Sequence, residues 1–136
     1  MPNNDRSESD PEQGTRASRI VKQVAGCDAS IKGVVVLDGL GHIIAGWSPA
    51  SATTTDQLSA SLVSKLGIVA KVVMGAMEKE TGMLGRMDFL VAAFQNDKLV
   101  LTDLQDQSMT LVFGISRSTM ADSVYDKVAK ILAATK

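Results

Sequence analysis

The chain has 136 residues, the length of one domain and enough for a substantial hydrophobic core. Hydrophobic residues make up 45% and charged residues 21%, which places the chain among ordinary globular proteins. Its 14 basic and 15 acidic residues leave a formal net charge of -1, so charge gives no reason to expect nucleic acid or an anionic membrane as the partner. The single cysteine, Cys27, excludes an internal disulfide and agrees with a cytoplasmic location.

The N-terminal segment, residues 1–14, holds two prolines, four acidic side chains and no large aliphatic residue beyond Met1. It cannot bury enough surface to offset its chain entropy, so we expect a disordered tail, and without an apolar core it is not a signal peptide. One domain, residues 15–136, then begins with a short helix from Thr15 to Ala25. Its apolar residues share one face, and Arg16, Arg19 and Lys22 are expected on the outside.

The most regular part of the chain is a hairpin. Ile31 to Leu37 is an almost continuous β-branched run, as expected of a strand covered on both faces. Asp38-Gly39-Leu40-Gly41 supplies residues that tolerate positive φ, and His42 to Trp47 is the returning strand. Trp47 is expected either to close an edge of the core or to anchor a partner.

A long helix is predicted from Asp56 to Glu80. Its aliphatic residues form a stripe expected against the sheet, made of Leu58, Leu62, Leu66, Val69, Val73 and Ala76, with Ile68 and Val72 on one flank. The remaining sector is mostly small, with Ala60, Ser64, Gly67, Lys71 and Gly75. Two glycines inside a helix cost roughly 1 kcal/mol each relative to alanine, so we expect a second helix to approach this small sector. The polar residues also make the segment unfit to cross a bilayer.

Three strands and a final helix follow, with strands predicted at 86–95, 98–104 and 108–115. The first has apolar residues on both sides, so this sheet is expected to be covered on both faces. Ser118 or Thr119 is expected to cap the last helix, which runs to Ala134. The order of elements predicts an α/β protein, more narrowly an α+β sandwich built on a five-stranded antiparallel sheet.

Few residues could do chemistry. His42 is the only histidine and no Cys/His cluster exists, so no metal site is expected, and Gly39-Leu40-Gly41 precedes a strand rather than a phosphate-binding helix. A Cys27–His42 dyad and an Asp103–Asp106 carboxylate pair stay open as minor alternatives. Arg86 and Arg117 could hold an anion, although surface ion pairs are the plainer interpretation. We therefore expect no enzyme and no cofactor.

The first hairpin, Gly33 to Ala45 with the sequence GVVVLDGLGHIIA, resembles the Gly-Val-x-x-x-Val-Asp-x-x-Gly-x-x-Ile run of the roadblock/dynein light chain domain family. The element order extends the resemblance over about Arg16 to Ala134, as in the single-domain prokaryotic members. The resemblance implies a non-catalytic dimer, with itself or with a related subunit, whose third strands pair across a two-fold axis. The long helices would lie together on one face of the sheet, and the first and last helices would cover the other.

The family likeness also implies a role. Its members bind small Ras-like GTPases as regulators or scaffolds, or serve as adaptors, and prokaryotic members act in cell polarity, motility and signalling. Carried onto this sequence, the dimer interface is expected to contain Val63, Ser64, Gly67, Ala70, Lys71, Met74, Gly75, Arg86, Asp88 and Leu90. A small-molecule sensor of profilin- or PAS-like architecture is the alternative, since the apolar hairpin and Trp47 also permit it.

Overall fold

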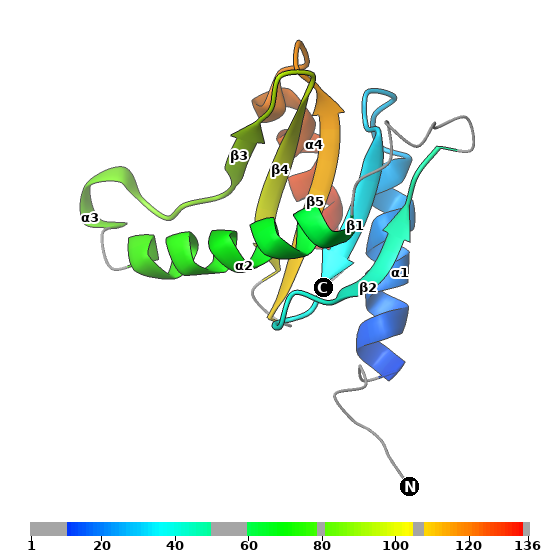
Figure 1. Cartoon of the computed structure of the whole chain (residues 1–136), viewed down its shortest axis with the longest axis horizontal. Coiled ribbons are helices and arrows are strands. Elements are labelled where there is room, and N and C mark those ends of the chain that lie inside the picture. The colour runs from blue at the N-terminus through cyan, green and yellow to red at the C-terminus, as the bar shows by residue number, and fades with distance from the viewer. Residues whose placement is uncertain (1–10, 50–59, 79–80, 105–107, 135–136) are drawn as a thin grey trace, which may run out of the picture.

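The computed structural model describes residues 11–49, 60–78, 81–104 and 108–134, and a five-stranded antiparallel sheet lies at its centre (Figure 1). Across the sheet the order is β2 (Ile43–Trp47), β1 (Gly33–Leu37), β5 (Met109–Ser116), β4 (Asp97–Leu104) and β3 (Leu90–Ala93). Two helices cover one face, α1 (Pro11–Ala25) and α4 (Ala121–Ala134). The other face carries α2 (Ala60–Met77), which is followed by the short α3 (Thr81–Leu84). The predicted fold class and the two-sided cover are confirmed.

The described buried residues form two hydrophobic clusters, one on each face of the sheet. Val34 and Val36 of β1 belong to the cluster under α1 and α4. Val35 and Leu37, which alternate with them, belong to the cluster under α2. Because successive side chains of a strand point to opposite faces, β1 must be apolar at every position. This is why its sequence shows no alternation.

The β1–β2 turn is held by one carboxylate. Asp38 Oδ1 accepts hydrogen bonds from the backbone N–H of Leu40, at 2.8 Å, and of His42, at 2.9 Å. Gly41 has a φ of 89°, which a residue with a side chain rarely adopts. The Asp38-Gly39-Leu40-Gly41 turn is therefore the one that the sequence predicts.

Two predicted boundaries need correction. Helix α1 begins at Pro11 rather than Thr15, with proline at the first helical position, where its missing N–H costs nothing; residues 1–10 of the expected tail lie outside the described residues. The strand predicted at 86–95 is shorter in the structure, where β3 covers only Leu90–Ala93. The hydroxyl of Thr102 in β4 donates to the backbone carbonyl of Asp88 at 2.7 Å, so the chain before β3 is held by a side chain and not by strand pairing. Arg86 and Asp88 consequently precede the strand on which they were expected.

The orientation expected for α2 is also wrong. Its small side faces the sheet, with Val63 and Ala70 at 0% and 2% exposure, and Gly67 is buried as well. A Cβ at Gly67 would occupy the position of the Leu37 side chain, so the glycine lets the helix approach the sheet closely. The sheet presents large side chains here, including Leu37 and Leu101, so the helix docks through its smaller side. Helix α2, Ala60–Met77, falls inside the helix predicted at 56–80. Residues 56–59 and 79–80 of that prediction are not among the described residues.

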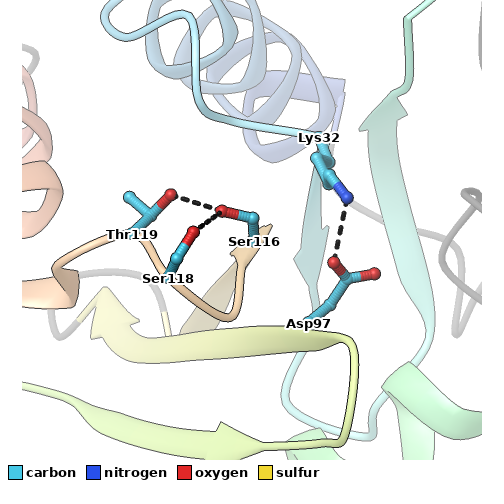
Figure 2. A network of polar contacts seen from close by, with 5 residues as sticks. All are labelled: Lys32, Asp97, Ser116, Ser118 and Thr119. Carbon is cyan, nitrogen blue, oxygen red and sulfur yellow. Dashed lines mark hydrogen bonds and ion pairs between the residues drawn. The ribbon is translucent and has the colours of Figure 1, made fainter.

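Polar contacts close the end of the sheet where β1 begins (Figure 2). Lys32 Nζ, just before β1, lies 3.0 Å from Asp97 Oδ1 at the start of β4. At the last residue of β5, the hydroxyl of Ser116 contacts those of Thr119 and Ser118, at 2.6 and 3.3 Å. The two predicted capping hydroxyls therefore contact Ser116 rather than a backbone N–H of α4.

Within the described ranges, no helix combines the length and apolar content that crossing a membrane requires.

The docking of α2 can be tested with two glycines of the same helix. Gly67→Ala should lower the free energy of unfolding, because overpacking against the fully buried Leu37 costs about 1–3 kcal/mol and outweighs the gain in helix propensity. Gly75→Ala should instead stabilise by up to about 1 kcal/mol, because a Cβ there meets nothing within 4 Å. Urea unfolding of both variants gives the comparison. Equal effects would mean that Gly67 does not face the sheet.

Candidate interaction surface

The side of α2 that points away from the sheet is apolar. We call this the outer α2 face and define it by Lys65, Ile68, Val69, Val72 and Ala76, all exposed. Ile68, Val69 and Val72 are 50%, 56% and 68% exposed, and Lys65 is the only charged member. A helix that ends its packing at one sheet normally turns polar residues to the solvent. Contiguous apolar residues in that position are typical of an interaction surface.

The edge strand β3 is the second part of the surface. It pairs with β4 on one side, and no described strand pairs with its other side. Val91 and the adjoining Phe94 are both 41% exposed, and the strand sequence, LVAA, contains none of the charges or prolines that usually protect an edge. This edge is therefore able to pair with another strand.

The path of α2 brings these two parts to the same side of the molecule. At the middle of α2, Ile68 lies against Gly41 of the β1–β2 turn. Three residues further along, Lys71 Nζ donates to the backbone carbonyl of Ser108 at 3.2 Å. The helix then continues past the β3 edge of the sheet toward α3, as Figure 1 shows. Its last turn and α3 add exposed apolar side chains there, with Met83 and Leu84 at 93% and 90%.

The structure divides the residues that were expected at a dimer interface. Val63, Gly67 and Ala70 are buried against the sheet, and Ser64, Lys71, Met74 and Leu90 are half-buried. Gly75, Arg86 and Asp88 are exposed. The sequence analysis missed Ile68, Val69 and Val72 as interface candidates. The wide apolar arc of α2 indicates that two sides of the helix are covered. It does not indicate which of these sides packs on the sheet.

The candidates for chemistry lie apart. Cys27 follows α1 and precedes β1, whereas His42 follows β1, so the length of that strand, roughly 16 Å, separates them. His42 Nδ1 instead lies 3.3 Å from Asp38 Oδ2. Asp103 Oδ1 lies 3.6 Å from Lys71 Nζ, and Asp106 is outside the described residues. The Cys27–His42 dyad is therefore excluded by the fold.

The other candidates have structural contacts. Arg117 donates to the backbone carbonyl of Phe94 at 3.0 Å, and Trp47 is 37% exposed at the end of β2. No group of three acidic, histidine or cysteine side chains gathers as metal ligands in the ranges that the structure describes.

Cys27 sits beside a charged cluster that joins α1 to α4. Asp28 accepts hydrogen bonds from Lys127 Nζ, at 2.8 Å, and from the backbone N–H and hydroxyl of Ser30. These donors hold the pKa of the Asp28 carboxyl well below its usual range. Burial, and then the negative charge of Asp28, raise the pKa of the Cys27 thiol, with Lys127 acting in the opposite direction. A thiol in this setting is a weak nucleophile.

Solved structures of other proteins share the fold of this chain. A gliding protein MglB from Thermus thermophilus is 13% identical, with 89% of this chain and 85% of that one covered and a TM-score of 0.62. A roadblock/LC7 domain from Streptomyces avermitilis is 11% identical, with 86% and 92% covered and a TM-score of 0.61. Myxococcus xanthus MglB is 17% identical, with 93% of both chains covered and a TM-score of 0.59. No protein-family model and no curated protein matches. The chain thus has the roadblock/LC7 fold, as its sequence predicts.

The electrostatics around Cys27 predict a specific alkylation profile. The rate of reaction with iodoacetamide should rise only at a pH above the usual thiol pKa, because burial and Asp28 both disfavour the thiolate. Asp28→Asn should shift the profile to lower pH, since it removes a negative charge and leaves Lys127 to favour the thiolate. Asp126→Asn, an exposed change on α4, is the control. An unshifted profile in Asp28→Asn would contradict this account of the thiol.

Proposed function

We propose that this protein is a non-catalytic, dimeric interaction module that regulates or scaffolds a small Ras-like GTPase. The observation that carries the proposal is the apolar outer α2 face beside the free β3 edge. An apolar helix face and an unpaired strand edge both require a protein surface to cover them, and a symmetric copy supplies each with a matching element. The alternative, a small-molecule sensor of profilin- or PAS-like architecture in which the sheet and helices enclose a ligand, receives no support from this face, which opens outward.

The dimer in this proposal uses a different side of α2 from the one expected at first. The outer α2 faces of two copies would pack together, and the two β3 strands would pair across the two-fold axis. Of the residues expected from the sequence, Gly75 and Leu90 keep a place at or near this interface. Val63, Gly67 and Ala70 would act indirectly, by holding α2 on the sheet so that its outer face stays presented.

The GTPase in the proposal derives from the family likeness. The fold is that of the MglB structures, one of which is described as a gliding protein. The resemblance of the sequence to the roadblock family implies a Ras-like GTPase as the partner. A cytoplasmic role in polarity, motility or signalling follows from the same likeness. The described part of this chain offers broad apolar surface, which suits a protein partner.

The dimer can be tested with two variants of equal exposure. Val72→Glu should weaken self-association at least about tenfold, because a charge would be buried without a partner at the interface. Met120→Glu is the matched control, since Met120 is 67% exposed against 68% for Val72 but belongs to the α4 side of the sheet. Light scattering over a dilution series measures the mass of each protein. A monomeric wild type, or equal dimers in both variants, would exclude this interface.

The GTPase is tested separately, on the dimeric wild type. The full chain should bind at least one Ras-like GTPase from the same organism, and bind one nucleotide state more tightly, in pull-downs with GDP and with a non-hydrolysable GTP analogue. A changed hydrolysis rate would assign a regulator, and an unchanged rate a scaffold. If a stable dimer binds none of these GTPases in either state, the dimer stands and the GTPase role is wrong.

A further inference from the structure

A cavity of about 250 Å³ lies on the α1 and α4 side of the sheet, away from the outer α2 face. Its walls come from α1, α4, β4 and the segment that precedes β3. Polar side chains include Arg16, Arg86, Asp88 and Tyr125, and much of the remaining wall is apolar, formed by residues such as Leu104 and Leu132. The cavity is thus lined by both charged groups and hydrocarbon.

Arg16 is the unusual member of this lining. The sequence predicts it on the outside of α1, yet it is half-buried, and its Nε is shielded from solvent without a hydrogen-bond partner. Within the described part of the chain, no acceptor contacts its guanidinium. A buried donor left unpaired is destabilising, and more so when the group is charged. The Nε–H of this lining residue is therefore available to donate to a ligand.

The charges around the cavity leave Arg16 as the unmatched group. Asp88 lies 3.9 Å from the Arg86 guanidinium, and Asp103 lies 3.6 Å from Lys71 Nζ. Each carboxylate in the lining therefore has a cation of its own. Asp103 Oδ1 is nevertheless buried without a hydrogen-bond partner. Arg16 has no counter-charge within ion-pair distance among the described lining residues, so a singly charged anion is the ligand that would balance it.

The hydrocarbon part of the cavity limits what else the ligand carries. The Tyr125 ring is fixed by stacking on Phe89, with centroids 4.5 Å apart and the rings tilted by 31°. Apolar cavities of roughly 150 Å³ hold benzene, and drug-sized ligands occupy about 300 Å³ or more. A space of about 250 Å³ between these limits suits one ring or one short branched chain together with its charged group.

We propose that this cavity binds a small organic carboxylate, with Arg16 pairing with the carboxylate and the apolar wall enclosing an aromatic or branched group. A planar guanidinium matches a carboxylate through two parallel hydrogen bonds. The proposal concerns the opposite face from the dimer surface and holds whether or not the GTPase role does.

The test is an NMR titration of the full chain, labelled with ¹⁵N, with benzoate as the probe. Millimolar benzoate should give saturable shifts at the Arg16 Nε–H and at the backbone amides of Tyr125 and Ala129. Benzamide, which has the same shape without the charge, and inorganic phosphate, which has charge without an apolar group, should give neither. This comparison needs no variant. Absence of saturable shifts with benzoate, or equal shifts with benzamide or phosphate, would overturn the proposal.

Two substitutions on α1 then locate the charge. Arg16→Gln should weaken benzoate binding at least about tenfold. Arg19→Gln, an exposed change on the same helix, should leave binding unchanged. Because no acceptor contacts Arg16 in the free protein, Arg16→Gln should also leave the urea midpoint unlowered, which a purely structural role would not allow. Equal benzoate affinity in the two variants would contradict the role of Arg16.

Discussion

The close approach of α2 to the sheet at Gly67 is the constraint on which the rest of this face depends. Leu37 fills the space where a side chain would otherwise stand, so the helix can dock only with its small side inward. Once that side is fixed, the helical period turns Ile68, Val69 and Val72 outward. The apolar outer α2 face is therefore a consequence of intramolecular packing, because the glycine that lets the helix dock on the sheet also fixes which side is exposed.

The two faces of the sheet differ in how completely they are covered. On one face, α1 and α4 enclose a large cluster that includes Ile20, Phe113 and Val128, all fully buried. On the other, α2 alone covers a smaller cluster and continues past the β3 edge. A single helix cannot enclose a five-stranded sheet, so the second face offers less burial per residue. The fold therefore buries most of its described core on the α1 and α4 side and leaves apolar side chains of α2 exposed on the other.

Much of the fold follows from local sequence because local physics determines it. The alternation rule makes β1 apolar throughout, and Asp38 closes its turn with bonds to residues two and four positions ahead. Such features need no knowledge of distant parts of the chain. The orientation of α2 is different, because its apolar arc is wide enough to dock on either side. The choice depends on Leu37, which is distant in sequence and whose fit to Gly67 no periodicity reveals.

The same limit applies to the candidate sites. Arg86 and Asp88 follow the alternation of a strand, but a side chain on the neighbouring strand, Thr102, takes the backbone carbonyl that pairing would have used. Arg16 likewise has the sequence position of a surface residue, and only the arrangement of α1 against α4 and β4 places it in a cavity. Both cases arise where the sheet loses its regular pairing before β3. Because β3 begins only at Leu90, the preceding segment with Arg86 is outside the sheet and forms part of the cavity wall beside Arg16.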